Sequence, residues 1–391
     1  MMIHNLLFLL LCTLFSHALA APTPGYPGRI VYEVNDGLDS TPSPRALERR
    51  AGLVPHVGDA NISIAPSGAY PRVTALADGS LLASYTAFSG STKTLTVVRS
   101  TDGGSTFSAW GAIASGTGDL DNTFLLQLPN GHVVAAFRNH DLGADGSPTY
   151  YRITACVSAD GGKTWAFLSQ VAERAATATN NGLWEPFMRL SSSGAIQVYY
   201  ASENSGADQD ILMKTSTDNG ATWPTTTTTV AGGTTTGRDG MPGCATFNDG
   251  AAKLMCVFET TEGHSDGTFS VKSVVSPDDG QTWGTRSQVF VPSGSGNNAG
   301  APQIVATPDG NLVVSFMTDE DTSAHNWPNS GVAFKIVTGT PVATGNWGHK
   351  TTVTGPQSDW PGLFTKSDGS VFGCVGASAG LICKDITFTA S

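Results

Sequence analysis

The sequence predicts an all-β fold, a six-bladed β-propeller with four-stranded antiparallel blades. Two independent repeats and the near absence of helical periodicity support this prediction. The first repeat is Ser-x-Asp-x-Gly-x-Thr-aromatic, whose four copies start 58, 58 and 60 residues apart, at Ser100, Ser158, Ser216 and Ser276. The second is a strand, a two-residue turn and another strand, with turns at Asp78-Gly79, Asn130-Gly131, Ser193-Gly194, Asp249-Gly250, Asp309-Gly310 and Asp368-Gly369.

Each repeat is long enough for about four short strands, which is one propeller blade. The six blades are expected at residues 55–113, 114–175, 176–233, 234–295, 296–353 and 354–391. The last range is short, so a strand from the N-terminal part of the chain is expected to complete this blade and close the ring.

The first 50 residues are expected to be removed from the mature protein. An apolar run from Leu6 to Phe15 is followed by the small residues Ala18 and Ala20, so residues 1–20 are typical of a secretory signal peptide. Residues 21–50 are rich in Pro and polar residues and end in Arg49-Arg50. They indicate a pro-segment cut at a dibasic site, with a flexible N-terminal arm as the alternative. Residues 51–391 would then form a single propeller domain, secreted to the extracellular space.

Composition argues against several classes of partner. Only 14% of the residues are charged and the net charge is -11, so the chain lacks the basic surface that nucleic acid requires. No apolar stretch after Ala20 reaches the roughly 20 residues of a membrane span. The sequence has no phosphate-binding fingerprint and no zinc motif, so we expect no cofactor and no catalytic metal. A closed propeller without a free sheet edge is expected to be a monomer.

Five of the six cysteines follow the predicted signal peptide. Cys244 and Cys256 flank a predicted turn symmetrically, and Cys374 and Cys383 bracket another, so each pair is predicted to form a disulfide between adjacent strands of an exported protein. Cys156 would remain as a buried free thiol. Asn61 begins the N-glycosylation sequon Asn-Ile-Ser and is expected on a surface loop.

The hairpins, aligned by their turns, predict which residues face one mouth of the propeller. Eight positions before the turns stand the residues expected to start the innermost strands: Tyr70, Asn122, Glu185, Met241, Ala301 and Trp360. The second strand of each hairpin returns to the same end. Its last residues share that mouth, and they include Arg138, Asn139, Glu203, Glu259, Asp319 and Glu320.

Glu185 and Glu259 are the candidate catalytic residues. Both stand in apolar surroundings, where a carboxylate is costly unless it is used or paired. Two carboxylates flanking one bond suit glycoside hydrolysis, in which one donates a proton and the other attacks or stabilises the anomeric carbon. The alternative is a structural salt bridge to Arg72, Arg189 or Arg238.

Further residues at the same mouth are candidates for substrate binding. Glu203 could orient a sugar or tune the pKa of a neighbour. Tyr70, Trp184 and Trp360 could stack on sugar faces, although burial is the commoner fate of Trp. Five side chains could bind hydroxyl groups: Arg72, Asn122, Asn139, Arg238 and Asp319.

The four Ser-x-Asp-x-Gly turns and their spacing resemble the Asp boxes of the sialidase superfamily of six-bladed propellers. In that superfamily these boxes lie away from the catalytic face, which implies structural roles for Asp102, Asp160, Asp218 and Asp278. Several segments resemble the fungal exo-α-1,5-L-arabinanases of glycoside hydrolase family 93: residues 183–187, 197–203, 238–241, 257–260 and 299–302. This resemblance implies retaining cleavage of linear arabinan with release of arabinobiose, Glu185 as general acid/base and Glu259 as nucleophile. Retention would place the two carboxyl groups about 5 to 5.5 Å apart.

Two other functions remain open from the sequence. A sialidase shares the fold, and Tyr70-Pro71-Arg72-Val73 resembles the first of the three arginine motifs of sialidases. However, no arginine follows Arg286, so blades five and six cannot supply the last member of a carboxylate-binding triad. A non-catalytic carbohydrate-binding propeller is the second alternative, and it would tolerate Glu-to-Gln changes at both candidate positions.

Overall fold

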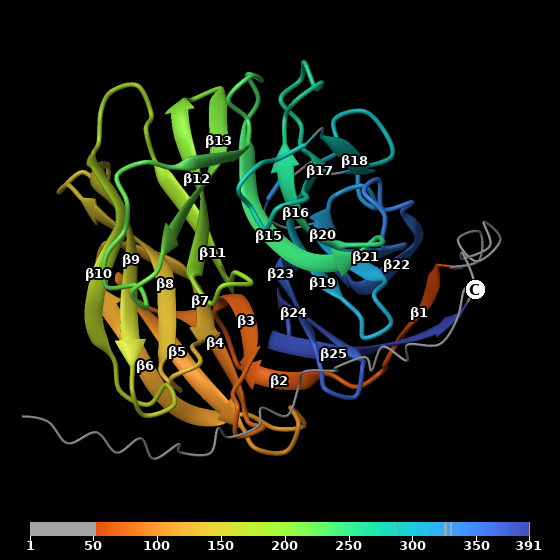
Figure 1. Cartoon of the computed structure of the whole chain (residues 1–391), viewed down its shortest axis with the longest axis horizontal. Coiled ribbons are helices and arrows are strands. Elements are labelled where there is room, and N and C mark those ends of the chain that lie inside the picture. The colour runs from red at the N-terminus through yellow and green to blue at the C-terminus, as the bar shows by residue number, and fades with distance from the viewer. Residues whose placement is uncertain (1–51, 285, 324–326, 329–330, 391) are drawn as a thin grey trace, which may run out of the picture. The chain divides into compact units, whose positions relative to one another are not determined.

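The computed structural model describes residues 52–284, 286–323, 327–328 and 331–390, and these residues form 25 β-strands and no helix (Figure 1). The strands form six antiparallel sheets, which are the six blades of a propeller. The signal peptide and pro-segment predicted for residues 1–50 lie outside the described residues.

Five blades each contain four consecutive strands, of which the first is innermost. Blade one contains β3 (Ala69–Ala75), β4 (Leu81–Ser89), β5 (Thr92–Ser100) and β6 (Ser108–Gly116). Blade two contains β7 (Asp119–Gln127), β8 (Val133–Leu142), β9 (Pro148–Ser158) and β10 (Ala166–Ala175). Blade three contains β11 (Leu183–Leu190), β12 (Ile196–Ser205), β13 (Asp208–Ser216) and β14 (Thr228–Ala231). Blade four contains β15 (Asp239–Asn248), β16 (Ala252–Thr260), β17 (Ser270–Ser276) and β18 (Ser287–Phe290). Blade five contains β19 (Ala299–Ala306), β20 (Leu312–Thr318), β21 (Ala333–Gly339) and β22 (Gly348–Pro356).

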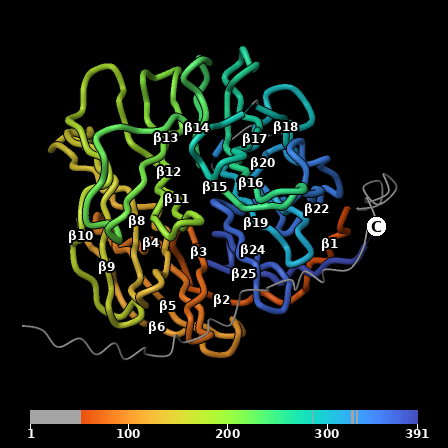
Figure 2. Tube along the Cα trace, viewed as in Figure 1, coloured from red at the N-terminus to blue at the C-terminus, as the bar shows by residue number. Residues whose placement is uncertain are grey.

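Blade six joins the two ends of the propeller. It contains β23 (Ser358–Thr365), β24 (Val371–Ala377), β25 (Gly380–Ala390), β1 (Leu53–Val57) and β2 (Ile62–Ala65). Both N-terminal strands pair antiparallel with β25, and they run beside it in Figure 1 and Figure 2. The predicted closing strand is therefore confirmed. The expectation that blade one begins at residue 55 was wrong, because residues 53–65 cover the edge of β25, which would otherwise leave its backbone groups unpaired.

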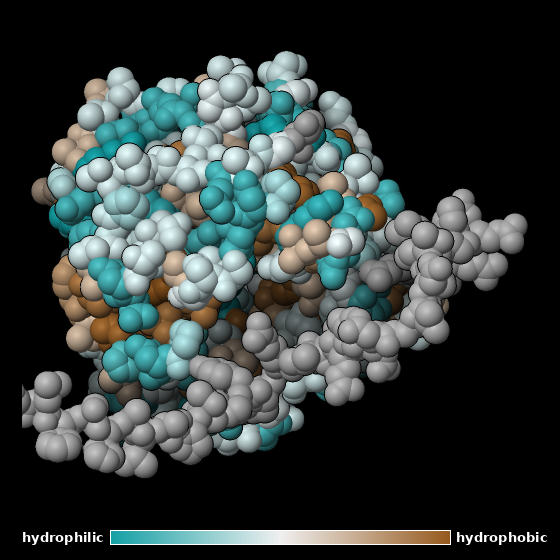
Figure 3. Space-filling model, in the orientation of Figure 1, coloured by the Kyte–Doolittle hydropathy of each residue, from teal (hydrophilic) through white to brown (hydrophobic). Residues whose placement is uncertain are grey.

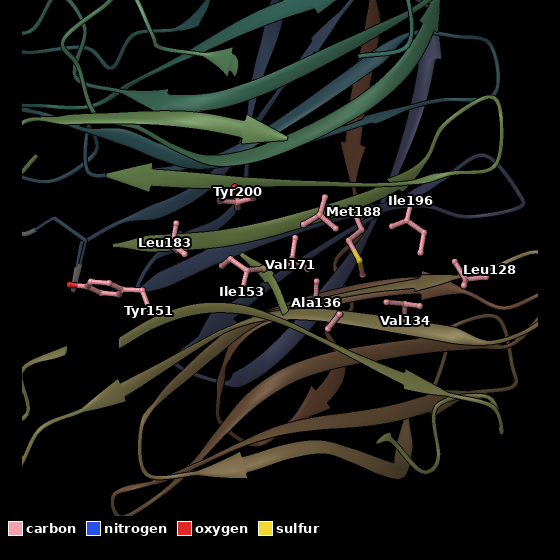
Figure 4. Close-up of a cluster of buried hydrophobic side chains, with 12 residues drawn as sticks. Leu128, Val134, Ala136, Tyr151, Ile153, Val171, Leu183, Met188, Ile196 and Tyr200 are labelled. Atoms are coloured by element: carbon pink, nitrogen blue, oxygen red, sulfur yellow. The ribbon is translucent and has the colours of Figure 1, made fainter. Parts of the chain in front are cut away.

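Buried apolar clusters join every pair of neighbouring blades. Figure 4 shows the cluster between blades two and three, where Val134 and Ile153 meet Met188 and Ile196. Burying one such side chain stabilises the fold by about 1.5 to 3 kcal/mol. The inner strands read as nearly continuous apolar runs because both faces of a blade are covered. The face seen in Figure 3 is mostly hydrophilic, with apolar residues in smaller patches.

Both predicted disulfides are formed. Cys244 and Cys256 are directly opposite each other on β15 and β16, and Cys374 and Cys383 are opposite each other on β24 and β25. The first therefore links the two innermost strands of blade four, and the second links the second and third strands of blade six. Cys156 is a buried free thiol, and burial raises the pKa of this thiol to about 11.

The four Ser-x-Asp-x-Gly turns share one hydrogen-bond pattern. In the first copy, the Oγ of Ser100 accepts the amide N–H of Gly104, and the Asp102 carboxylate accepts the amide and hydroxyl of Thr106. The same contacts recur in the other three copies. In blade four, Ser276 is opposite Leu254 near the start of β16, whereas Glu259 is near its end. These turns and the candidate carboxylates therefore lie at opposite ends of the blade.

Candidate active site

A β-bulge in the innermost strand of each blade creates the site. The bulged residue has positive φ, between 44° and 59°, in all six blades: Tyr70, Asn122, Glu185, Met241, Ala301 and Trp360. The strand register shifts at the same place in each blade. A non-Gly residue in this conformation costs about 1 to 3 kcal/mol. The bulge re-aims one side chain per blade, and it falls on the six positions that the hairpin alignment selected.

Contacts among the bulged residues show that they meet at the axis. The rings of Tyr70 and Trp360 are 4.7 Å apart between centroids. Asn122 Nδ2 lies 3.9 Å from the sulfur of Met241. Tyr70, Met241 and Ala301 belong to one apolar cluster, against which Trp360 packs. Glu185 is thus placed beside a small apolar core, where its ionised form is poorly solvated.

Glu185 is half-buried and weakly hydrogen-bonded. Its Oε2 accepts the amide N–H of Met241 at 3.4 Å, across the boundary between blades three and four. Burial, and next the negative charge of Glu259, raises the pKa of Glu185 to about 7; Arg138 and Arg238 oppose this shift. The environment therefore favours the protonated form of Glu185 near neutral pH.

Glu259 is half-buried in β16 and accepts a shorter hydrogen bond than Glu185 does. Its Oε2 accepts the amide N–H of Ala301 at 2.7 Å. Burial raises the pKa of Glu259 to about 7, while this hydrogen bond and the charge of Arg238 favour the ionised form. Neither Glu185 nor Glu259 forms an ion pair with a described residue, because Arg189 pairs with Asp279, Arg238 pairs with Glu203, and Arg72 donates to backbone carbonyls.

Two glycines make room for the Glu259 carboxylate. A Cβ on Gly240 would lie 3.1 Å from Glu259 Oε1, and a Cβ on Gly300 would collide with Oε2. The ring of Trp327 would also crowd a side chain at position 300, at 2.9 Å. The glycine at position 300 thus allows the carboxylate to reach the amide of Ala301.

Gly300→Ala is expected to lower activity at least about 100-fold with little loss of folded protein, because the added methyl group displaces the Glu259 carboxylate by a distance that disrupts a reacting geometry. Gly355→Ala in β22 is the matched control, since a Cβ there meets nothing within 4 Å. Activity and circular dichroism of both variants would be compared with wild type. Full activity of Gly300→Ala would contradict the placement of Glu259.

Glu203 and Arg238 form a brace beside the two carboxylates. Glu203 is buried and accepts Arg238 Nη2 at 2.8 Å and the amide N–H of Gly182 at 2.8 Å. Arg238 also donates to Gln209 Oε1, and Gln209 donates to the carbonyl of Asp239. Glu203 therefore offers no free carboxylate to a substrate. Instead, it holds the positively charged guanidinium of Arg238 close enough to act on Glu259 and Glu185.

Arg72 and Arg138 are buried, and each is held by the protein. Arg138 pairs with Asp119 at 3.0 Å and with Asp121 at 3.3 Å, and these charges raise its pKa against the effect of burial. Arg72 donates to the carbonyls of Pro71 and Trp360, and burial lowers its pKa to about 10. Both border the cluster at the axis.

Three of the residues suggested for substrate binding are engaged elsewhere. Trp184 packs against His140 and Tyr151, with ring centroids 4.9 and 6.0 Å away. Asn139 donates to Thr154 Oγ1 within blade two. Asp319 is fully buried and accepts the amide N–H of Asn298 at 2.6 Å. These contacts give all three side chains structural partners.

Sequence reasoning missed two residues beside Glu259 and Arg238. Trp327 lies between β20 and β21, at the same mouth as the end of β20, and Gln209 lies in β13. The position of Trp327 after the second strand of a hairpin was the available signal. Among the described residues, no group of three or more His, Cys, Asp or Glu side chains could hold a metal ion. No helix of the described chain is long and apolar enough to cross a membrane.

The fold resembles those of known glycosidases. The chain aligns with an α-L-arabinanase of Penicillium chrysogenum, complexed with arabinobiose, at a TM-score of 0.63 and 21% identity, covering 86% of this chain and 97% of that one. A GH93 α-L-arabinofuranosidase of Fusarium graminearum, with arabinobiose, gives 0.62 and 20% with the same coverage. The NanB sialidase of Streptococcus pneumoniae gives 0.54 and 12%, covering 88% of this chain and 72% of that one.

No family model matches the chain, and no curated protein matches it. At these identities the likeness shows the fold. The chain therefore has the propeller fold of these glycosidases.

Proposed function

We propose that the protein is a retaining glycoside hydrolase that cleaves α-1,5-linked L-arabinan from a chain end and releases arabinobiose. The observation that carries this proposal is the unequal environment of two adjacent carboxyl groups. Glu259 accepts a 2.7 Å amide hydrogen bond, whereas Glu185 accepts one of 3.4 Å and is repelled by the charge of Glu259. Glu185 is therefore the proton donor and Glu259 the ionised nucleophile.

The reaction then follows in two steps. First, the Glu259 carboxylate attacks the anomeric carbon while the glycosidic C–O bond breaks and Glu185 gives its proton to the leaving oxygen. Second, Glu185 takes a proton from water, the resulting hydroxide attacks the anomeric carbon, and the bond to Glu259 breaks. Arg238, held by Glu203, favours the ionised Glu259 in the free enzyme.

A neutral sugar fits this site better than a sialic acid. Recognition of a substrate carboxylate needs free arginine forks. Arg138 and Arg238 are already paired with protein carboxylates, and no arginine occurs after Arg286. The two most similar glycosidases reported above are complexed with arabinobiose, which supports an arabinan-derived substrate. Segments around both carboxylates also resemble family 93.

The direct test is to incubate the purified protein with debranched linear arabinan and with a sialoside, and to identify products by chromatography and their anomeric configuration by NMR. Release of arabinobiose with retained configuration is expected. Free sialic acid would replace the proposal with a sialidase. Binding of arabinan without any product would indicate a carbohydrate-binding propeller.

The pH dependence of kcat/KM is expected to be bell-shaped, with its maximum between mildly acidic and neutral pH. Both carboxyl groups have pKa values raised to about 7, and the pair titrates as a unit. Activity falls at high pH as Glu185 loses its proton, and at low pH as Glu259 gains one. Rates measured between about pH 4 and pH 9 would define both limbs. A maximum above about pH 8 would contradict the assignment.

We also propose that the mature chain begins near residue 51, acts outside the cell and is a monomer. The two disulfides are compatible with an oxidising compartment. Asn61 is exposed just before β2, where a glycan could be attached. N-terminal sequencing and the mass of the secreted protein would test these expectations together.

A further inference from the structure

A pocket of about 380 Å³ lies at the junction of blades six and one. Its lining includes the hydrogen-bonding side chains Ser67, Gln357, Asp359 and Ser378, together with Trp360 and Gly376. Trp360 connects it to the axis, because its ring packs on Tyr70. Burial raises the pKa of Tyr70, and the charges of Asp121 and Glu185 add to this shift. The pocket thus borders the cluster that contains the candidate catalytic residues.

Asp359 in this pocket is structurally equivalent to Asp121 in blade two. Each immediately precedes the bulged residue of its blade, Trp360 or Asn122. Asp121 is fully used by the protein, because it accepts hydrogen bonds from Thr86 Oγ1, the amide of Asn122 and Arg138. A carboxylate at this position can therefore be held by three donors when the neighbouring blades supply them.

Blade six lacks these donors. The residue opposite Asp359 on the second strand is Gly376, whereas the residue opposite Asp121 is Arg138. The preceding blade supplies Met317 at the place of Thr86, and its sulfur accepts the amide of Trp360 rather than donating to Asp359. Asp359 Oδ1 is buried without a hydrogen-bond partner among the described residues. Burial also raises the pKa of this carboxyl group to about 6.

We propose that this pocket is a sugar-binding subsite, in which hydroxyl groups of a neutral glycosyl unit donate to Asp359 while the unit contacts Trp360. A carboxylate only accepts hydrogen bonds, so it is matched by hydroxyl donors. Gly376 leaves the space that an arginine fills in blade two. A metal ion is a poorer match, because Asp359 is not part of any cluster of three ligating side chains in the described chain.

This inference rests on the proposed function, since the glycosyl unit would belong to the same arabinan chain, at a distance from the bond that is cleaved. Loss of a hydrogen bond to a charged group weakens binding by about 10- to 100-fold. The loss should be confined to substrates long enough to reach the pocket.

Two variants and one control test the subsite. Asp359→Asn removes the charged acceptor, and Gly376→Arg fills the pocket while restoring the pairing seen in blade two. A Cβ at position 376 makes only ordinary contacts, at 3.4 Å or more, so the second variant should fold. Asp59→Asn, at an exposed aspartate between β1 and β2, is the control.

The measurement is kcat and KM on arabino-oligosaccharides of increasing length and on an aryl arabinofuranoside too short to reach the pocket. We expect KM to rise about 10-fold or more for long substrates in both variants, with the short substrate unaffected. Equal losses at every length, or no loss, would overturn the subsite. If wild type cleaves neither kind of substrate, the proposed function itself fails, and the subsite fails with it.

Discussion

Glu259→Gln is expected to lower kcat by about 1,000-fold or more while the propeller stays folded, because an amide cannot attack the anomeric carbon. Glutamine keeps the size of the side chain, so the loss reports chemistry rather than packing. Turnover of linear arabinan and circular dichroism spectra would be measured together.

Glu185→Gln should lose most activity on arabinan but much less on aryl glycosides, whose leaving groups need no proton.

Glu259→Gln is also expected to make the protein more stable at neutral pH. Burial raises the pKa of Glu259 to about 7, above the value of about 4.3 in an unfolded chain. A raised pKa contributes stability that is present below about pH 4 and is lost as pH rises towards 7. Glutamine never ionises, so Glu259→Gln should gain about 1 to 2 kcal/mol at pH 8 relative to wild type and little at pH 4, with the shift discounted for partial exposure.

Glu173→Gln is the matched control, because Glu173 is exposed on β10 far from the axis in its blade. It should change neither turnover nor melting temperature. Retention of a tenth of wild-type activity by Glu259→Gln would rule out this residue as the nucleophile. Loss of activity together with loss of the folded spectrum would show that Glu259 is structural.

The hairpin turns allowed the sequence to predict which residues lie at the axis. Asp-Gly and Asn-Gly turns set the register of each hairpin, and a fixed offset of eight residues then reaches the bulged position. Glu185, Met241 and Trp360 were found in this way although they have no common chemistry. A periodic backbone can thus be predicted from turn chemistry without knowledge of its side-chain contacts.

Pairing between distant side chains could not be predicted. Glu203 and Asp319 are candidates for sugar binding because they lie at the ends of second strands. In the structure, Glu203 already pairs with the Arg238 guanidinium, and Asp319 accepts the backbone N–H of Asn298. These partners are 35 and 21 residues away, and no local pattern specifies them. Asp359 is not among the residues that the sequence predicts for the site. Its significance is that no described residue forms an ion pair with it, which only the comparison with Asp121 reveals.

The strand that closes blade six also shows what local patterns leave out. The sequence predicts that an N-terminal strand closes blade six, but it places residues 55–65 in blade one. In the structure they pair with β25, more than 300 residues later, where Leu53 is opposite Ala390. Ring closure depends on which sheet edge remains unpaired, and this is a property of the whole chain.

The largest expected loss of stability follows from replacing Arg286. This residue directly precedes β18 in blade four and pairs with Asp239, the first residue of β15. Its guanidinium pairs with Asp239 at 2.5 and 2.8 Å and also with Glu262 at 2.7 Å. Asp239 has no exposed surface and burial raises its pKa, so it depends on this partner. Arg286→Met is therefore expected to lower the free energy of unfolding by about 3 to 5 kcal/mol, because an uncompensated charge remains buried.

Arg152→Met provides the comparison, since Arg152 pairs with the exposed Asp141 and should contribute no more than about 1 kcal/mol. Without Arg286 the pKa of Asp239 rises further, so the loss should grow as pH increases from about 4 to 8. Adding Asp239→Asn should recover part of the stability. Asp239 directly precedes Gly240 and Met241, which contact Glu259 and Glu185. Denaturant unfolding and turnover would be measured on all three variants. Equal stabilities of Arg286→Met and Arg152→Met would contradict the stabilising role of this buried pair. Turnover of Arg286→Met at the wild-type level would show that the pair does not fix the geometry of the two carboxylates.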